Sequence, residues 1–194
     1  MTTNPMAPST AAAKTTTSLS FHHHLITLDT TISQSIHTLF HSMIPRFFLH
    51  LLEYSADFRL SFPVALSLYF TPIRPTCLIP FLLGLLLDLL LIGLVKSIFR
   101  RSRPHYNPSM IPAVSVDNFS FPSGHASRVF YIAGFAYLFT VFNGTGWFLV
   151  SVWTWALLTS VSRVLLGRHF VLDVFAGACL GVLEAMFVFR FLRI

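Results

Sequence analysis

His169 and Asp173 are the two residues whose types and spacing suggest chemistry most directly. They lie four residues apart at the start of a predicted helix, so the carboxylate can reach the imidazole ring. An acid in this position holds one tautomer and makes the other ring nitrogen a better nucleophile. The alternative is an ordinary ion pair, although ionisable groups within apolar, membrane-like segments are costly and usually functional.

The tetrapeptide Pro122-Ser123-Gly124-His125, just before a long apolar run, could form a cradle for an anion. Gly124 permits close backbone approach, and the first N–H groups of a helix have no partner inside it. The hydroxyl of Ser123 and the imidazole of His125 would lie beside those donors. A plain Pro-Ser-Gly helix start explains the tetrapeptide equally well.

Lys96 and Arg103 form the third group, and Pro104 follows them directly. If the preceding helix continues, the two cations are seven residues apart and share one face, and the proline ends the helix. Taken alone, this cluster is more typical of cations that anchor a helix end to lipid headgroups and set its orientation.

The composition indicates what kind of scaffold positions these groups. Of the 194 residues, 54 % are hydrophobic and 10 % are charged, and the mean hydropathy is +0.70. A soluble domain carries about 25 % charged residues. These values exclude an ordinary cytosolic enzyme, a disordered tail and a fibrous repeat, and they indicate an integral membrane protein.

The charge balance is basic, with 13 Lys and Arg against 7 Asp and Glu and a formal net charge of +6. Nearly all of these cations are arginines, which suit planar contacts with phosphate or carboxylate. Basic runs interleaved with aromatics are absent, so we expect the lipid bilayer and no nucleic acid as partner. Cys77 and Cys179 both lie in apolar runs and leave the redox compartment open.

The first 50 residues carry little of this chemistry. Residues 1–24 are rich in Thr, Ser, Ala and Pro and lack a continuous apolar core, which predicts a disordered tail rather than a signal peptide. Residues 25–50 mix apolar and polar positions with a helical period, and we expect an amphipathic helix at the bilayer surface, ended by Pro45. The membrane-embedded domain is then residues 51–194.

Five apolar runs follow, which we compare with the roughly 20 residues needed to cross a bilayer. The runs cover residues 52–70, 77–95, 129–142 (extendable from 121), 147–166 and 170–191. The first is weak because Glu53, Asp57 and Arg59 crowd its start. Strand-like alternation is absent, so we predict an all-α, polytopic transmembrane helical bundle with about five crossings.

The order of these crossings places many cations at one membrane boundary. A tight turn at 143–146 returns the chain to the side where the 77–95 run ends. The basic and imidazole side chains expected on that side are Lys96, Arg100, Arg101, Arg103, Arg128, Arg163, Arg168, His105, His125 and His169. Hydropathy alone therefore gathers the three groups on one face.

Lys96 is followed by six residues and Arg103-Pro104, then comes Pro122-Ser123-Gly124-His125, then Ser162-Arg163 with five residues before His169 and three more before Asp173. This pattern resembles the type-2 phosphatidic acid phosphatase superfamily, with its motifs complete, in order and at the family's internal spacing. The resemblance spans residues 96–173. It implies the haloperoxidase-like helical fold of that superfamily.

Further segments look similar to one branch of that superfamily. They are Leu85-Leu86-Leu87-Asp88-Leu89-Leu90-Leu91, Arg100-Arg101-Ser102-Arg103-Pro104, Ser115-Val116-Asp117-Asn118-Phe119-Ser120-Phe121 and Ser127-Arg128. The branch contains the polyisoprenoid and presqualene diphosphate phosphatases. The size and the Thr/Ser-rich start are similar to the plant lipid phosphate phosphatases of the beta type.

The resemblance implies a role for each motif residue. His169 is the nucleophile that attacks phosphorus and forms a phosphohistidine, Asp173 orients it, and His125 protonates the leaving oxygen and then activates water. The phosphate oxygens are held by Lys96, Arg103, Ser123, Gly124 and Arg163. The implied substrates are isoprenyl (di)phosphates, phosphatidate or both.

We expect no metal ion and no other cofactor. The predicted site offers one carboxylate, Asp173, whereas magnesium sites combine carboxylates with substrate phosphates. Its histidines come from separate segments, among cations that would repel a divalent ion.

The sequence also suggests roles for several other residues. Arg128 lies within one helical turn of His125, so together with Arg101 it could contact the second phosphate of a diphosphate; a snorkelling arginine fits equally well. Residues 105–120 could form a lid over the site, or a plain interfacial loop. Asp88 and Glu184 are candidates for structural hydrogen bonds within the bundle.

Two other classes of protein stay open. A non-catalytic lipid-binding protein that keeps the fold should have lost His169, His125 or Asp173, and all three are present. A channel or transporter with a basic vestibule is disfavoured because the runs lack paired inverted halves.

The resemblance implies the endoplasmic reticulum as the location of the protein. The sequence leaves open the oligomeric state and the side of the membrane that the site faces.

Overall fold

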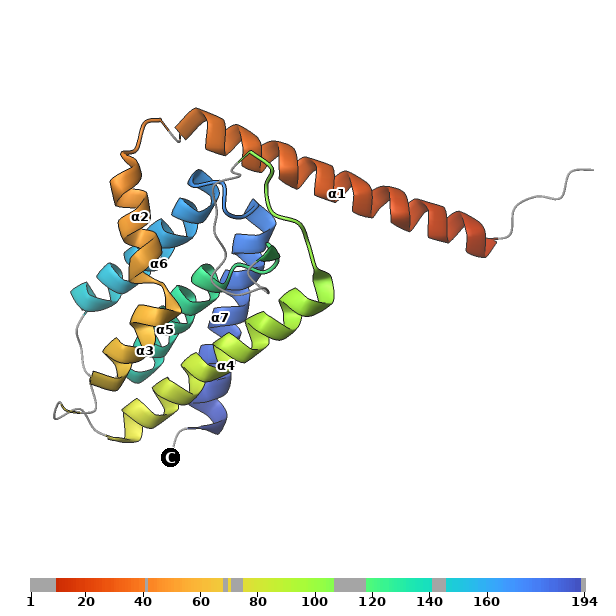
Figure 1. The fold of residues 1–194 in the computed structure, drawn as a ribbon. Coiled ribbons are helices and arrows are strands. Elements are labelled where there is room, and N and C mark those ends of the chain that lie inside the picture. Colours follow the sequence, from red (N-terminus) through yellow and green to blue (C-terminus); the bar gives the residue numbers. More distant parts are fainter. Residues whose placement is uncertain are drawn as a thin grey trace, which may run out of the picture.

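The computed structural model describes residues 10–40, 42–67, 70, 75–106, 118–140 and 146–192. The regular elements in these residues are α1 (Thr10–Phe40), α2 (Arg46–Ser55), α3 (Phe58–Ser67), α4 (Pro75–Phe99), α5 (Gly124–Thr140), α6 (Gly146–Leu165) and α7 (Val171–Phe191). In Figure 1, α2 to α7 form one bundle, and α1 crosses an end of it and projects beyond as a long arm. The expected all-α architecture is confirmed.

Three helices are long and apolar enough to cross a membrane, namely α4 from Cys77 to Phe99, α6 and α7. Helix α5 has 17 residues and is therefore about 25 Å long, somewhat less than the hydrocarbon thickness of a bilayer. It nevertheless lies between α4, α6 and α7 and packs on all three. The chain is thus an integral membrane protein built as a polytopic helical bundle.

The weak first run differs from the expected single crossing. Within residues 52–67 the run contains the end of α2 and all of α3. Each of these helices has ten residues and is about 15 Å long, which is too short to cross alone. Asp57 causes the break, because its carboxylate accepts the N–H of Arg59 at 2.8 Å and so begins a new helix. The described residues therefore contain fewer helices long enough to cross a bilayer than the five crossings that we expected.

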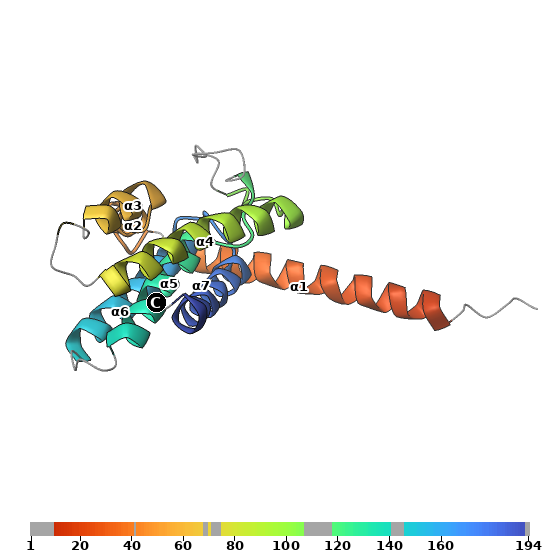
Figure 2. The same ribbon diagram turned by 90° about the horizontal axis from the view of Figure 1, so that it is seen from below.

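The N-terminal region also differs from the prediction. Helix α1 begins at Thr10, so part of the stretch expected to be a disordered tail is helical, and it ends at Phe40, before Pro45. Residues 1–9 lie outside the described part of the chain. Figure 2 shows that α1 leaves the bundle at an end rather than packing along its length. Its exposed apolar side chains are Leu25, Ile26, Leu28, Ile32, Leu39 and Phe40.

Two glycines bring α7 against α5 at backbone contact distance. A Cβ at Gly177 would collide with the backbone oxygen of Ser123, and one at Gly181 with that of Ser127. Small residues four apart on one helix allow this approach within a membrane. The contact fixes the first turn of α5, where the predicted anion cradle lies, against the first turns of α7.

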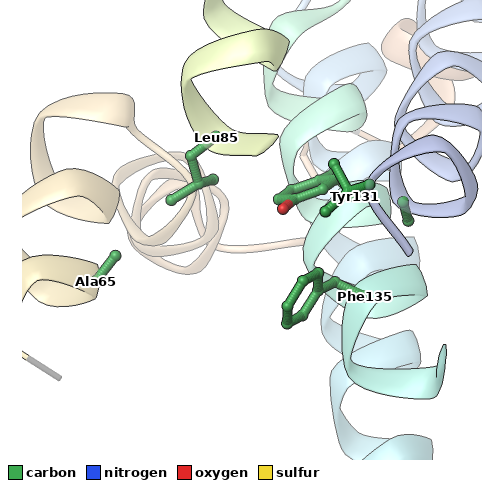
Figure 3. Packing of buried hydrophobic residues seen from close by; sticks show 6 residues of the cluster. Ala65, Leu85, Tyr131 and Phe135 are labelled. Carbon is green, nitrogen blue, oxygen red and sulfur yellow. The ribbon is translucent and has the colours of Figure 1, made fainter. Parts of the chain in front are cut away.

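The apolar core joins α3, α4, α5 and α7. Figure 3 shows Leu85, Tyr131 and Phe135 near one another, with Ala65 across from them on α3. Tyr131 is fully buried, and its hydroxyl donates to the carbonyl of Phe81 at 3.0 Å, which satisfies its polar end. This core holds the helices whose ends carry the motif residues.

Asp88 and Arg128 form a buried ion pair between α4 and α5. Arg128 Nη2 lies 3.0 Å from Asp88 Oδ2, and Arg128 Nη1 donates to the carbonyl of Ala56 at 3.0 Å. Asp88 is fully buried, and Glu184 is also buried, on α7. The pair agrees with the structural role expected for Asp88.

Replacing Asp88 by Ala should strongly destabilise the bundle. The change leaves the buried guanidinium of Arg128 without its carboxylate, which costs about 3–5 kcal/mol of unfolding free energy. Thermal unfolding of the purified protein in detergent measures the loss. The double variant Asp88→Ala/Arg128→Met should recover most of it, and a single variant as stable as the wild type would contradict the assignment.

Candidate active site

His169 lies in the short connection between α6 and α7, and a glycine turn places it there. Gly167 has a φ of 63°, in the left-handed region that favours glycine, and it ends α6. The carbonyl of Arg163 accepts the N–H of Arg168 at 2.9 Å, which tightens this turn. As a result, the side chain of His169 is turned inward and is 1 % exposed.

A backbone carbonyl sets the tautomer of His169. Its Nδ1 lies 2.8 Å from the carbonyl oxygen of Ser120, an acceptor, so Nδ1 carries the hydrogen. The carboxylate of Asp173, which we expected to hold the ring, is 3.8 Å from Nδ1. The prediction is corrected accordingly: Asp173 is close to the ring, but the N–H of Nδ1 donates to the carbonyl of Ser120 and not to the carboxylate of Asp173. Nε2 keeps its lone pair.

The surroundings of His169 keep the imidazole neutral. Burial lowers its pKa well below the ordinary value of 6.5, and the positive charges of Arg103, Arg163 and Lys96 lower it further. The Nη1 of Arg103 lies 3.4 Å from Nε2 and also donates to the carbonyl of Arg168 at 2.8 Å. A neutral imidazole with an unprotonated Nε2, beside several cations, is suited to attack an anionic centre.

Asp173 organises the first turn of α7 and is fully buried. Its Oδ1 pairs with Arg101 at 2.7 Å, and its Oδ2 accepts the N–H of Phe170 at 2.9 Å. Its own carbonyl accepts the N–H of Ser123 at 2.9 Å, which ties the start of α5 to the start of α7. Asp173 therefore links the histidine connection to the predicted anion cradle.

The motif residues from four segments converge at this point. Lys96 on α4 and Arg163 on α6 are both buried, and their charges act on His125 in the first turn of α5. Ser123, also buried, accepts the N–H of Ala126 at 3.4 Å. The structure thus brings together groups that are up to 73 positions apart in the sequence.

Comparison with known proteins identifies the family. Residues 77–193, more than half of the chain, match the PAP2 superfamily. The chain belongs to the PAP2 superfamily. The resemblance expected from the motifs is confirmed.

Similarity to individual PAP2 proteins extends beyond the matched residues. The chain is 48 % identical over 193 residues to the probable lipid phosphate phosphatase beta of Arabidopsis thaliana, covering 87 % of this chain and 91 % of that protein.

Two solved structures share the fold. The first transmembrane PAP2 type phosphatidylglycerolphosphate phosphatase from Bacillus subtilis aligns with a TM-score of 0.69 and 24 % identity, over 87 % of this chain and 86 % of that one. LpxE of Aquifex aeolicus aligns with a TM-score of 0.65 and 22 % identity, over 83 % and 94 %. At these identities the likeness shows the fold alone.

Two arginines of this PAP2 chain are paired with carboxylates of the protein. One hypothesis for Arg128 and Arg101 was contact with a second phosphate, with a snorkelling arginine as the alternative, and both stay predictions. Arg128 is committed to Asp88, and Arg101 bridges Asp29 and Asp173 at 2.6 and 2.7 Å. Both guanidinium groups are therefore occupied by carboxylates of the protein itself.

Glu53 is a site residue that the sequence analysis treated only as a charge crowding an apolar run. Its Oε1 lies 2.6 Å from Nη1 of Arg163 and 3.4 Å from Nε of Arg168, and its Oε2 lies 3.0 Å from His50. The sequence signal for this role was the position of an acid at the start of an apolar run, because a charged group there requires a partner of opposite charge. The carbonyl of Ser120 left no signal in side-chain chemistry.

The lid expected at residues 105–120 lies mostly outside the described residues, including Met110, Ile111 and Val114. Tyr106 is its last described residue before the gap. Burial, together with the negative charges of Asp29 and Asp173, raises the pKa of Tyr106 to about 12, against an opposing effect of Arg101. Tyr106 therefore stays a neutral phenol beside the site.

Replacing Glu53 by Ala should destabilise the protein, because it removes the carboxylate from buried Arg163. Loss of one partner of such a pair costs about 3 kcal/mol. Thermal unfolding in detergent measures the effect, with Glu53→Gln as a milder control that keeps an acceptor. Added inorganic phosphate should raise the unfolding temperature of the alanine variant more than that of the wild type, since an oxyanion can replace the carboxylate. Equal shifts would contradict the assignment.

Proposed function

We propose that this PAP2 protein is an integral-membrane phosphatase that removes phosphate from lipid phosphates. The observation that carries the proposal is the neutral, buried His169, whose Nε2 lone pair faces Arg103 while its Nδ1 hydrogen is held by Ser120. Similarity to a plant protein named as a probable lipid phosphate phosphatase supports the choice of a lipid substrate.

The proposed reaction has two steps. In the first, Nε2 of His169 bonds to phosphorus, the bond from phosphorus to the lipid oxygen breaks, and His125 gives that oxygen a proton. In the second, His125 takes a proton from water, whose oxygen bonds to phosphorus, and the bond between nitrogen and phosphorus breaks. The products are inorganic phosphate and the lipid with one phosphate fewer.

The cations supply most of the transition-state stabilisation. Phosphoryl transfer depends mainly on positioning and on balancing the charge that spreads over the equatorial oxygens. Lys96, Arg103 and Arg163 provide that charge, and Ser123 with the N–H of Gly124 provides neutral donors. Arg103 is positioned beforehand by its hydrogen bond to the carbonyl of Arg168 at 2.8 Å. A preorganised site of this kind does not reorganise during the reaction.

The proposed substrates are isoprenyl (di)phosphates and phosphatidate. Both lipid classes share a terminal phosphate, the group that Lys96, Arg103 and Arg163 would hold. We propose that the reaction is metal-independent, because the residues around His169 are cations rather than clustered carboxylates. By family resemblance, we also propose the endoplasmic reticulum as the location.

Purified protein should release inorganic phosphate from farnesyl diphosphate and from short-chain phosphatidate, at rates unchanged by excess chelator. His169→Ala should abolish release from both, because it removes the nucleophile, while its unfolding temperature in detergent stays near that of the wild type. Phosphate release measures both results.

Three outcomes would contradict the proposal. A folded His169→Ala protein that still releases phosphate would rule out the histidine as nucleophile. Loss of activity in chelator, restored by magnesium, would rule out the metal-independent reaction. A folded wild-type protein that binds these lipids without releasing phosphate would support the non-catalytic alternative.

The acid side of the pH profile should report the lowered pKa of His169. Because the free enzyme keeps this imidazole neutral below pH 6.5, kcat/KM should hold as pH falls through 6.5 and decline only at lower pH, where His169 becomes protonated. The phosphate pKa of the substrate, measured separately, is the control. A decline centred above pH 6.5 that does not follow the substrate would contradict the prediction.

A further inference from the structure

Helix α1 contacts the bundle through a polar stripe of side chains, and Ile36 of the same helix packs against the cluster of Leu49, Leu165 and Leu166. Asp29, Ser33 and His37 are four residues apart, so they form one stripe along the helix. Asp29 and Ser33 are 4 % and 0 % exposed, whereas the neighbouring Leu28 and Ile32 are 45 % and 51 % exposed. His37 is hydrogen-bonded to the end of α6. The stripe therefore faces the protein, whereas Leu28 and Ile32 face outward.

Two residues of this stripe cap α7, the helix that carries Asp173. The residue at the N-cap of α7 is Phe170, whose side chain has no hydrogen-bond acceptor. The N–H of Val171 donates to Oγ of Ser33 at 2.9 Å, and the N–H of Leu172 donates to Oδ1 of Asp29 at 3.0 Å. These amides have no partner within α7, so α1 supplies the cap that the sequence of α7 lacks. A carboxylate there also suits the helix dipole.

The other oxygen of Asp29 reaches the catalytic groups through Arg101. Its Oδ2 lies 2.6 Å from Nη2 of Arg101, whose Nη1 lies 2.7 Å from Oδ1 of Asp173. The second oxygen of Asp173 is 3.8 Å from Nδ1 of His169. One guanidinium thus connects two buried carboxylates, of which one belongs to α1 and the other lies beside the nucleophile.

We propose that Asp29 is a positioning residue of the active site, which holds Arg101 and the first turn of α7 so that Asp173 keeps its place beside His169. This inference rests on the proposed function. Asp29 acts through Arg101 and the backbone of α7 and does not touch the substrate.

The electrostatic consequence follows from the shared guanidinium. While Asp29 balances part of the charge of Arg101, Asp173 keeps negative charge available to offset the positive charge that His169 gains when Nε2 bonds to phosphorus. Without the charge of Asp29, Arg101 would neutralise Asp173 more completely. The chemical step would then slow, whereas phosphate binding by Lys96, Arg103 and Arg163 would be little changed.

The test compares full-length Asp29→Asn with Ser33→Ala, using a short-chain lipid phosphate in detergent. Asparagine keeps an oxygen for the N–H of Leu172, but it removes the negative charge and places an NH2 donor where Oδ2 accepted from Arg101. We expect Asp29→Asn to lower kcat about tenfold with KM within about twofold, the signature of an interaction lost mainly in the transition state. Ser33→Ala removes the matched cap and the 3.5 Å hydrogen bond from Ser33 Oγ to Asp29 Oδ1, but it keeps the charge of Asp29 and its pair with Arg101. Its kcat should stay within about twofold of the wild type.

A double variant separates the route through Arg101 from general docking of α1. If Asp29 acts through that arginine, Asp29→Asn should have no further effect on kcat in an Arg101→Gln background. Additive effects, an unchanged kcat in Asp29→Asn, or equal losses in Asp29→Asn and Ser33→Ala would each overturn the proposal. If Asp29→Asn does not fold, Asp29→Glu serves as the second variant, because it keeps the charge but displaces the carboxylate. We expect it to lower kcat, and a kcat equal to that of the wild type would overturn the proposal. Inactive wild-type protein would instead refute the proposed function.

Discussion

A carboxylate beside each of three arginines is the interaction on which the rest of this structure depends. The pairs are Arg163 with Glu53, Arg128 with Asp88, and Arg101 with Asp29 and Asp173. A guanidinium buried without a counter-charge costs several kcal/mol, and neighbouring guanidinium groups also repel one another. A cluster of cations at a membrane boundary can therefore be assembled only if acids from other helices balance most of its charge.

Two of the four acids that provide this balance come from outside the motif-bearing region. The match to the PAP2 superfamily begins at residue 77, whereas Asp29 and Glu53 lie on α1 and α2. These helices supply no residue that we propose to act on phosphate. They nevertheless set the positions of Arg101 and Arg163, so the N-terminal third of the chain belongs to the site for electrostatic reasons.

The motif residues could be predicted from sequence because spacing and hydropathy both constrain them. His169 and Asp173 are local in the chain, and the order of crossings placed Lys96, Arg163 and His125 on the same side without a structure. The all-α bundle followed from composition in the same way. The break between α2 and α3 was harder to predict, because it depends on whether Asp57 caps a new helix or is carried along by one continuous helix.

Partners of the charged residues could not be predicted, because spacing along one helix says nothing about which acid approaches from another. Arg128 has a suitable position near His125, but Asp88 of α4 takes its guanidinium. Ser120 acts through its carbonyl, which every residue possesses, so its type carries no signal. Asp29 is the one acid among residues 1–50, yet only the fold shows that it meets the start of α7.

His169 needs a fixed tautomer, and it must also stay neutral until it attacks phosphorus. A single carboxylate bonded to the ring would meet the first requirement and work against the second. A carboxylate bonded directly to Nδ1 would stabilise the imidazolium and raise the pKa of His169, and a protonated ring cannot attack phosphorus. The neutral carbonyl of Ser120 fixes the tautomer without adding negative charge, and Asp173, at 3.8 Å, remains close enough to offset charge once it forms. Arg101 pairs with both Asp173 and Asp29. The balance of charge around His169 is therefore set in part by α1, a helix that lies outside the bundle.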